Sequence, residues 1–287
     1  MKPVKNKICL ITGATAGIGE VTALKLAEMG ATVVGVGRNP AKCAVSTARI
    51  REITGNSNVE FLIADLSSQA QIHTLAESFR QKYDRLDVLV NNAGAVFLTR
   101  QLSVDEIEKT FALNHLGYFL LTHLLLDVLK ASAPARIVNV SSAAHMSGEM
   151  DFNDIEIRHS YSAWRAYARS KLANVLFTYE LARRLNGTGV TANALHPGFV
   201  ATDFAYNNFH GLLWLVRLFY WLYQKFSAIS PEEGAETMIY LASSPEVEGV
   251  TGKYFYKRRE KRSSPVSYDV SVAKRLWEIS EKMTGMV

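Results

Sequence analysis

The chain has 287 residues, which allows one large α/β domain or two small ones. With 48% hydrophobic and 21% charged residues it can bury a sizeable core, so its bulk is not disordered. The net charge of +5 is too small and diffuse to indicate nucleic-acid binding. The two cysteines lack disulfide-framework or CxxC spacing and the histidines are scattered, which predicts a reduced, cytoplasmic setting and no metal site.

No stretch of the sequence has the run of about 18 apolar residues that a membrane-spanning helix requires. The longest apolar stretches, 118–126 and 212–223, are interrupted by His123 and Arg217. The apolar residues 8–11 are too few for a signal peptide and lead directly into a glycine turn. We therefore expect a soluble chain that starts almost directly at its first strand.

Short apolar segments alternate with amphipathic helical segments along most of the chain. Most of the apolar segments are continuous, which is typical of strands buried on both faces of a parallel sheet. This order predicts a doubly wound, Rossmann-type α/β fold with helices on both faces, and we expect 1–287 to be a single domain. The predicted strands are 7–12, 32–37, 59–64, 86–90, 135–140 and 190–195, and Gly30 is expected to end the helix after the first strand.

A glycine-rich turn, with the sequence TGATAGIG, follows the first predicted strand. Glycine lets such a turn tighten and lets backbone N–H groups approach a pyrophosphate at the positive end of the next helix. Strand-to-helix turns also use glycine for steric reasons alone, but this position in a βαβ pattern favours nucleotide binding. The residues expected to contact a dinucleotide here are Gly13, Thr15, Ala16, Gly17, Ile18 and Gly19.

An arginine follows the second predicted strand, at the place where an NAD-selective site carries Asp or Glu for the ribose 2′-hydroxyl. The sequence there is Val36-Gly37-Arg38-Asn39, with no carboxylate. A guanidinium matches the geometry and charge of a 2′-phosphate, so Arg38 predicts NADP(H) as the cofactor. The alternative is that Arg38 is a solvated loop arginine.

Polar residues also follow the third and fourth predicted strands. In a parallel sheet the ligand lies at the carboxyl ends of the strands, so Asp65 and Leu66 are candidates for cofactor contact, as are Asn92, Ala93 and Gly94. Asp65 could instead cap a helix that begins near residue 67 or 68. The Asn-Asn-Ala-Gly run is harder to explain as a generic turn.

Tyr167 and Lys171 lie four residues apart in a predicted helix over 162–185 and therefore share one face of it. A cation beside a phenol stabilises the phenolate and lowers its pKa from about 10 toward neutrality. Such pairs are common on solvated helices, but this one follows the fifth strand, whose end carries Ser141 and Ser142. The serine hydroxyls are expected to hydrogen-bond a substrate oxygen.

With these motifs the chain resembles the short-chain dehydrogenase/reductase family over nearly its whole length. The strings around Asn114 (LNHLG) and around Lys171 (SKLAN), with the long gap between Ser142 and Tyr167, resemble the retinol dehydrogenase-like branch. Membrane-bound members of that branch carry a hydrophobic N-terminal anchor, whereas this sequence starts almost directly at its first predicted strand, so the resemblance does not imply retinoid specificity. The residues that carry the resemblance are the glycine-rich turn, Asn92, Ala93, Gly94, Asn114, Ser142, Tyr167, Lys171, Pro197 and Gly198.

The resemblance implies a role for each of these positions. Tyr167 would be the general acid in carbonyl reduction, and Lys171 would lower its pKa and hold the nicotinamide ribose. Ser142, rather than Ser141, would bind the substrate oxygen, and Asn114 would hold a water that links Lys171 to solvent. The nicotinamide would be contacted by Pro197, Gly198, Val200 and Thr202, and the pro-S hydride of C4 would be transferred.

The function that these expectations define is NADP(H)-dependent reduction of a lipophilic aldehyde or ketone, or the reverse reaction. Retinal, a steroid or a medium-chain carbonyl would suit an apolar site. The alternatives are an NAD-dependent alcohol dehydrogenase, a catalytically silent NADPH-binding regulatory protein, and a peripheral membrane protein in which catalysis is incidental. The presence of all four catalytic-type residues argues against the silent protein.

Two stretches fall outside the repeating pattern. The aromatic segment within 203–230 lies where the family has its variable substrate region, and it could form a lid, a packed core or homo-oligomer helix, or a membrane contact. The basic run KRREKR at 257–262 is expected to be a solvated surface turn, and anionic lipid headgroups are its alternative partner.

Overall fold

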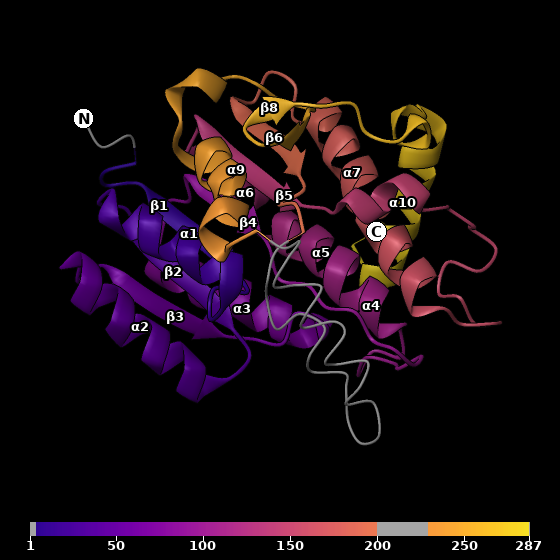
Figure 1. The fold of residues 1–287 in the computed structure, drawn as a ribbon, viewed down its shortest axis with the longest axis horizontal. Helices are drawn as coiled ribbons and strands as arrows, with labels where there is room; N and C mark the ends of the chain where they lie inside the picture. The colour runs from indigo at the N-terminus through magenta and orange to yellow at the C-terminus, as the bar shows by residue number, and fades with distance from the viewer. Residues whose placement is uncertain (1–3, 200–228, 287) are drawn as a thin grey trace.

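An eight-stranded sheet crosses the middle of the molecule in the order β3-β2-β1-β4-β5-β6-β7-β8. The computed structural model describes residues 4–199 and 229–286 (Figure 1). Every neighbouring pair of strands is parallel except β7 and β8, which are antiparallel. The strands are β1 (Ile8–Thr12), β2 (Thr32–Gly37), β3 (Val59–Ile63), β4 (Val88–Asn91), β5 (Ala135–Val140), β6 (Val190–Leu195), β7 (Tyr254–Tyr256) and β8 (Arg259–Glu260).

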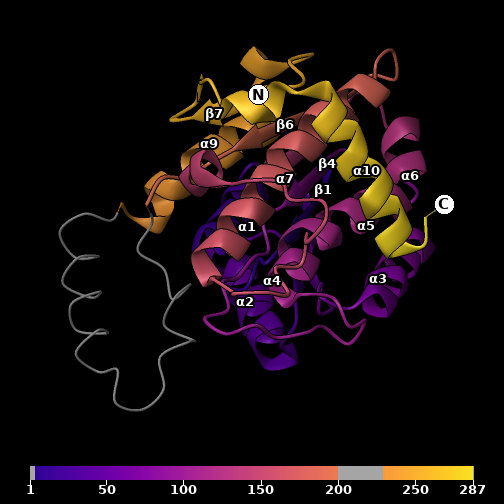
Figure 2. The ribbon, with the colours of Figure 1, turned by 90° about the vertical axis from the view of Figure 1, so that its right-hand side faces the viewer.

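Helices cover both faces of this sheet. One face carries α1 (Gly17–Glu28), α2 (Pro40–Thr54) and α9 (Pro231–Ser243), and α1 lies against α9 in Figure 1. The other face carries α3 (Gln69–Lys82), α5 (Gly117–Leu124), α6 (Leu126–Ala131) and α7 (Ala163–Arg184). In Figure 2, α10 (Val270–Thr284) lies along the outside of α7. The short α4 (Lys109–Phe111) leads into α5.

The two core layers follow from the alternation of side chains along the strands. In β1, Cys9 and Ile11 pack with α1 and α9, whereas Leu10 packs on the opposite side with α3, α5 and α7. All three side chains are fully buried. A strand buried on both faces has no polar side to display, which explains the continuous apolar runs in the sequence.

The fold class predicted from the sequence is confirmed. Strands β2, β5 and β6 have the predicted bounds, and Gly30 ends α1 in the left-handed conformation with a φ of 84°. The short strands β7 and β8 were not predicted, and β8 gives the parallel sheet an antiparallel edge. The predicted lid, 203–230, lies outside the described residues except for its last two positions.

The sheet order determines where a ligand can bind. The chain continues from β1 to β2 on one side and from β4 to β5 on the other, so a switch point lies between β1 and β4. Open α/β sheets bind ligands in the crevice at the carboxyl edge beside such a point. The segments that follow β1 to β6 lie along this edge, and they hold the predicted site residues of the described chain other than Asn114, Tyr167 and Lys171.

Candidate active site

The turn between β1 and α1 forms a cradle of bare backbone. Gly13 and Gly17 have φ values of 66° and 57°, the left-handed region that favours glycine. A Cβ at Gly19 would lie 2.3 Å from the carbonyl oxygen of Gly13, so no other residue fits there. No side chain caps α1 at Ala16, which leaves the positive end of that helix to an anion. The cradle therefore fits the pyrophosphate of a dinucleotide.

A set of hydrogen bonds ties this cradle to the end of β4. The backbone N–H groups of Asn92 and Ala93 donate to the Thr12 hydroxyl oxygen, at 2.8 and 3.0 Å. The Asn92 amide donates in return to the Thr12 carbonyl at 2.8 Å. The Asn-Asn-Ala-Gly run thus connects the turn after β1 to the turn after β4 by hydrogen bonds, and these two turns border the crevice.

Arg38 and Asp65 lie at the ends of β2 and β3. Arg38 is exposed, and among the described residues it has no ion-pair partner, so its guanidinium can meet a ligand phosphate. Asp65 Oδ1 accepts hydrogen bonds from the backbone and hydroxyl of Ser67, at 2.9 and 2.7 Å. The helix cap of α3 is Ser68, so the proposed capping role of Asp65 is wrong, although Asp65 does shape the preceding turn. Leu66 is buried beside it.

Lys171 is the most unusual group of the site, because its ammonium lies in the protein interior. The residue is 3% exposed, and its Nζ donates to the Val140 carbonyl at 3.2 Å. It lies 5.6 Å from the ring centre of Tyr167 and 5.8 Å from that of Tyr118. Burial lowers the pKa of Lys171 to about 7.

Asn114 is placed by a π-turn, Ala112–Leu116, inserted between α4 and α5. Its side chain exchanges two hydrogen bonds of 2.9 Å with the backbone of Ala95, and its amide also donates to the Ser170 hydroxyl at 3.0 Å. A Cβ at Gly94 would lie 3.2 Å from Asn114 Oδ1 and 3.4 Å from Lys171 Nζ. The structure therefore brings Gly94, Asn114, Tyr167 and Lys171 together. Single π-turns are frequent at functional sites.

The two serines after β5 differ in the state of their hydroxyls. Ser141 is buried, and its hydroxyl donates to the Lys171 carbonyl at 2.7 Å. This hydroxyl therefore has no proton left to donate to a substrate oxygen. Ser142 is half-buried, and its oxygen accepts from the Ala144 N–H at 3.2 Å. Its own proton remains available, so the geometry favours Ser142 for a substrate oxygen.

Two buried histidines near the site were not identified from the sequence. His145 accepts from the Ser264 N–H at 3.1 Å, so its neutral ring carries the proton on Nδ1 and donates it to the Ser142 carbonyl at 2.7 Å. His196, directly before Pro197, stacks on Tyr256 with ring centres 4.1 Å apart. Of the other predicted nicotinamide contacts, Gly198 has a φ of 95°, and Val200 and Thr202 lie outside the described residues.

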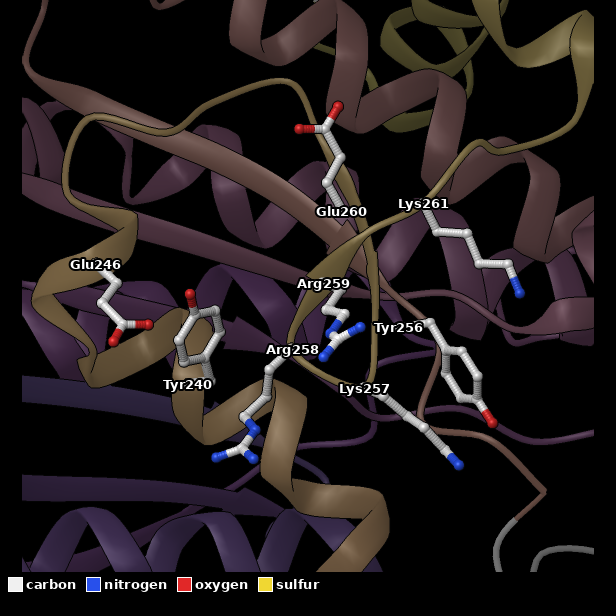
Figure 3. Close-up of a pocket in the computed structure, with 8 residues that line it drawn as sticks. All are labelled: Tyr240, Glu246, Tyr256, Lys257, Arg258, Arg259, Glu260 and Lys261. Atoms are coloured by element: carbon white, nitrogen blue, oxygen red, sulfur yellow. The ribbon is translucent and has the colours of Figure 1, made fainter.

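The basic run forms the hairpin between β7 and β8 rather than a plain turn. Its tip, Lys257 and Arg258, has φ values of 48° and 60°, and the Arg258 N–H donates to Thr237 of α9 at 3.1 Å. Figure 3 shows its side chains around an open depression of about 730 Å³. Of its basic side chains, Arg258 pairs with Glu236 at 3.7 Å, while the run's own Glu260 pairs at 2.8 Å with Lys253, which lies outside the run.

Within residues 4–199 and 229–286, no helix has the length and apolar character needed to cross a membrane.

Comparison with known proteins agrees with this geometry. The model of the short chain dehydrogenase family matches residues 7–212. Human retinol dehydrogenase 14 is 44% identical over 98% of this chain and 87% of its own length, and human polyprenol dehydrogenase is 42% identical over 99% and 87%. Among solved structures, an uncharacterized protein from Mycobacterium Paratuberculosis superposes with a TM-score of 0.79, at 32% identity over 99% of this chain and 95% of its own.

The fold and these similarities define an oxidoreductase that acts on alcohol or carbonyl groups with a nicotinamide dinucleotide. The chain belongs to the short-chain dehydrogenase/reductase family, and within it to the retinol dehydrogenase-like branch.

We predict that Lys171→Met raises the melting temperature at pH 7 by several degrees. Burial lowers the pKa of Lys171 from 10.5 to about 7, so between those values the unfolded chain holds a proton that the folded protein lacks. The free energy of unfolding therefore rises with pH in this window. Near pH 7 the buried ammonium lowers the free energy of unfolding by a few kcal/mol, and a methionine in its place would remove this penalty. Thermal unfolding at pH 7 and pH 9 should show the advantage of Lys171→Met shrinking at the higher pH.

The matched control is Lys130→Met, which removes an exposed ammonium from α6 and should leave the melting temperature nearly unchanged. A lower melting temperature of Lys171→Met at pH 7, or an equal advantage at both pH values, would contradict the burial cost.

Proposed function

We propose that the protein is an NADP(H)-dependent reductase of lipophilic aldehydes or ketones, which also catalyses the reverse oxidation. The observation that carries this proposal is the buried Lys171 ammonium beside Tyr167, at the carboxyl edge of the sheet and next to the bare cradle of Gly13–Gly19. Such a site can hold a dinucleotide and a carbonyl while one phenol provides a proton.

Each side chain has a defined task in this reaction. Tyr167 donates a proton to the substrate oxygen, and Ser142 hydrogen-bonds the same oxygen. Lys171 stabilises the phenolate that remains and holds the ribose hydroxyls, while Asn114 supports the path by which the proton is replaced. NADPH, when bound, would supply the hydride, and the family resemblance implies that it is the pro-S hydride of C4.

The preference for NADP(H) is supported by the end of β2. Arg38 is exposed there without a carboxylate partner among the described residues, and Thr15 packs against Gly37, where a Cβ would lie 2.5 Å from its methyl group. A ribose 2′-phosphate needs such a cation and no nearby acid. One structural neighbour, RhlG of Pseudomonas aeruginosa, is a complex with NADP and superposes with a TM-score of 0.70 at 29% identity, over 88% of this chain and 95% of its own.

A lipophilic substrate is supported by exposed apolar side chains that lie close in the chain to the candidate site residues. Trp164, Met146 and Phe199 are 59%, 57% and 41% exposed, and each lies within four residues of Tyr167, Ser142 or Gly198. The ring centres of Trp164 and Tyr167 are 6.5 Å apart. Exposed apolar groups beside a polar site are typical of a pocket for an apolar ligand. The similar retinol and polyprenol dehydrogenases are named for long apolar alcohols.

We predict that Tyr167→Phe lowers kcat for NADPH-dependent reduction at least a hundredfold, because the substrate oxygen loses its proton donor. The assay follows NADPH oxidation at 340 nm with retinal, steroid ketones and medium- and long-chain aldehydes. Tyr161→Phe, which removes a phenol that donates to the Phe97 carbonyl at 3.0 Å, is the matched control and should keep most of the activity. NADPH binding without turnover of any carbonyl by the wild type would favour a regulatory protein instead.

The cofactor preference is tested by Arg38→Asp. The new carboxylate repels a 2′-phosphate and accepts hydrogen bonds from a ribose 2′-hydroxyl, so we expect KM for NADPH to rise at least tenfold and KM for NADH to fall. Arg49→Asp is the control, because Arg49 is an exposed arginine of α2 that pairs with Glu20. An NADH preference of the wild type, or an unchanged ratio in Arg38→Asp, would show that Arg38 is a solvated loop residue.

We also propose that the basic hairpin places the protein at anionic lipid headgroups. Four basic side chains of the run are exposed and form no ion pair with another described residue: Lys257, Arg259, Lys261 and Arg262. Tyr256 lines the depression (Figure 3), and a Cβ at Gly198, one of the predicted nicotinamide contacts, would lie 3.7 Å from its ring. Each basic residue near an anionic surface contributes about 1 kcal/mol, and a lipophilic substrate would be delivered from that surface.

The lipid proposal predicts salt-sensitive binding to vesicles that contain phosphatidylserine and none to vesicles of phosphatidylcholine alone. The double variant Lys257→Glu/Arg259→Glu should bind at least tenfold more weakly in co-sedimentation. The control Lys42→Glu/Lys130→Glu makes the same change in net charge on α2 and α6. No sedimentation of the wild type, or equal loss in both double variants, would refute the role of the hairpin.

A further inference from the structure

Ser142 begins a tight turn that is anchored on one side by Ser141. The Ser141 N–H donates to the Leu195 carbonyl of β6 at 2.7 Å. Within the turn, the Ser142 hydroxyl oxygen accepts from the Ala144 N–H at 3.2 Å, and the Ser142 carbonyl accepts from the His145 N–H at 3.1 Å. These two bonds shape the turn but move with it, so they do not place Ser142 relative to the rest of the site.

The His145 side chain links this turn to a residue far along the chain. Its Nδ1 donates to the Ser142 carbonyl at 2.7 Å, which is shorter than either bond within the turn, and its Nε2 accepts from the Ser264 N–H at 3.1 Å. A backbone N–H can only donate and a carbonyl can only accept, so these neighbours leave one tautomer to the neutral ring, with its proton on Nδ1. Burial lowers the pKa of His145, which favours the neutral ring near pH 7.

The surroundings of the ring agree with this tautomer. The Tyr254 hydroxyl lies 3.3 Å from Nδ1, and because that nitrogen carries the proton, the hydroxyl oxygen can only be a second and longer acceptor of it. The ring centres of His145 and Tyr254 are 4.7 Å apart. His145 is 1% exposed, so bulk water does not compete for either ring nitrogen.

Ser264, which holds Nε2, belongs to a segment that is itself fixed to α7. The Ser264 carbonyl accepts from the Ser267 hydroxyl at 2.6 Å. The next residue, Tyr268, stacks on Tyr179 of α7 with ring centres 5.5 Å apart. The His145 imidazole therefore connects Ser142, through this segment, to the helix that carries the candidate catalytic phenol.

We propose that His145 is a positioning residue, which holds the Ser142 carbonyl and thereby keeps the Ser142 hydroxyl at a fixed place relative to Tyr167. The proposal rests on the role proposed above for Ser142. The hydroxyl and the phenol must meet the same substrate oxygen, and a misplacement of about 1 Å can lower a rate by roughly a hundredfold. Without the imidazole, the turn loses the anchor that follows Ser142.

The test is a double-mutant cycle between His145 and Ser142, with kcat for NADPH-dependent carbonyl reduction as the readout. His145→Leu should lower kcat at least tenfold when the Ser142 hydroxyl is present. In the Ser142→Ala background it should cost less than about threefold, because no hydroxyl remains to be positioned. The Kd for NADPH should stay within about twofold in all three variants. Equal losses in the two backgrounds, which a merely structural residue would give, would overturn the proposal.

Two amide variants separate the two ends of the ring. The amide of His145→Asn can take the place of Nδ1 and donate to the Ser142 carbonyl, so kcat should return to within about threefold of the wild type. The longer His145→Gln reaches the place of Nε2 and Ser264 instead, and it should resemble His145→Leu. The reverse order of the two variants would contradict the proposal. If His145→Leu does not fold, this contrast still decides.

His123→Leu is the matched control, because His123 Nδ1 also donates to a backbone carbonyl, that of Phe119 in α5 at 2.9 Å. It should leave kcat within about twofold of the wild type, and a tenfold loss there would overturn the specific role of His145. Full activity of Ser142→Ala would refute the role of Ser142 and the positioning by His145 together. Full activity of Tyr167→Phe would instead refute the proposed catalytic assignment.

The state of the ring can be measured independently of activity by ¹⁵N NMR of the histidine side chains, with the His145 signals assigned by their absence in His145→Asn. We expect a neutral ring with its proton on Nδ1 at pH 7. A proton on Nε2, or a charged ring, would overturn the proposal, because the ring could not then accept from Ser264 while donating to Ser142.

Discussion

An ammonium group held away from water is the constraint on which the rest of the site depends. Lys171 is 3% exposed, and its one hydrogen bond within the described residues goes to the Val140 carbonyl. Its other neighbours are the rings of Tyr167 and Tyr118. A buried charge without a carboxylate partner is expensive, and proteins retain it where function requires it. Here burial lowers the pKa of Lys171 to about 7, beside the ring of Tyr167.

The doubly wound fold provides the rigid surroundings that this charge needs. Strand β5 ends at Val140, whose carbonyl faces α7, while the π-turn after β4 brings Asn114 to the same helix. A buried chain of amides and hydroxyls continues beneath the sheet edge, from Asn91 through Asn139 and Thr178 to Asn174, with distances of 2.6 to 3.0 Å. These hydrogen bonds restrict the arrangements open to the buried layer, although Asn91 Oδ1 has no hydrogen-bond partner among the described residues.

The sequence predicted those parts of the molecule that depend on local pattern. Mainly apolar runs located β2, β5 and β6 to the residue, although β5 and β6 also hold the buried polar residues Asn139 and Asn193. Strands β7 and β8 are too short to show a periodic pattern of hydrophobic residues. The basic residues of the hairpin between them gave no indication of β-structure. The positions of Asn114, Tyr167 and Lys171 relative to the sheet could be expected from the family resemblance. The position of His145 could not, since its partner Ser264 lies far along the chain.

The proton affinity of Lys171 is the quantity that decides this account. It can be measured in the wild-type protein by NMR titration of ¹⁵N-labelled lysine side chains, with the signal assigned by its absence in Lys171→Met. We predict an inflection near pH 7, well below the value of about 10.4 for an exposed lysine. An inflection at pH 10 or above would show that the ammonium is solvated or paired, and it would contradict the buried, uncompensated charge at the centre of the site.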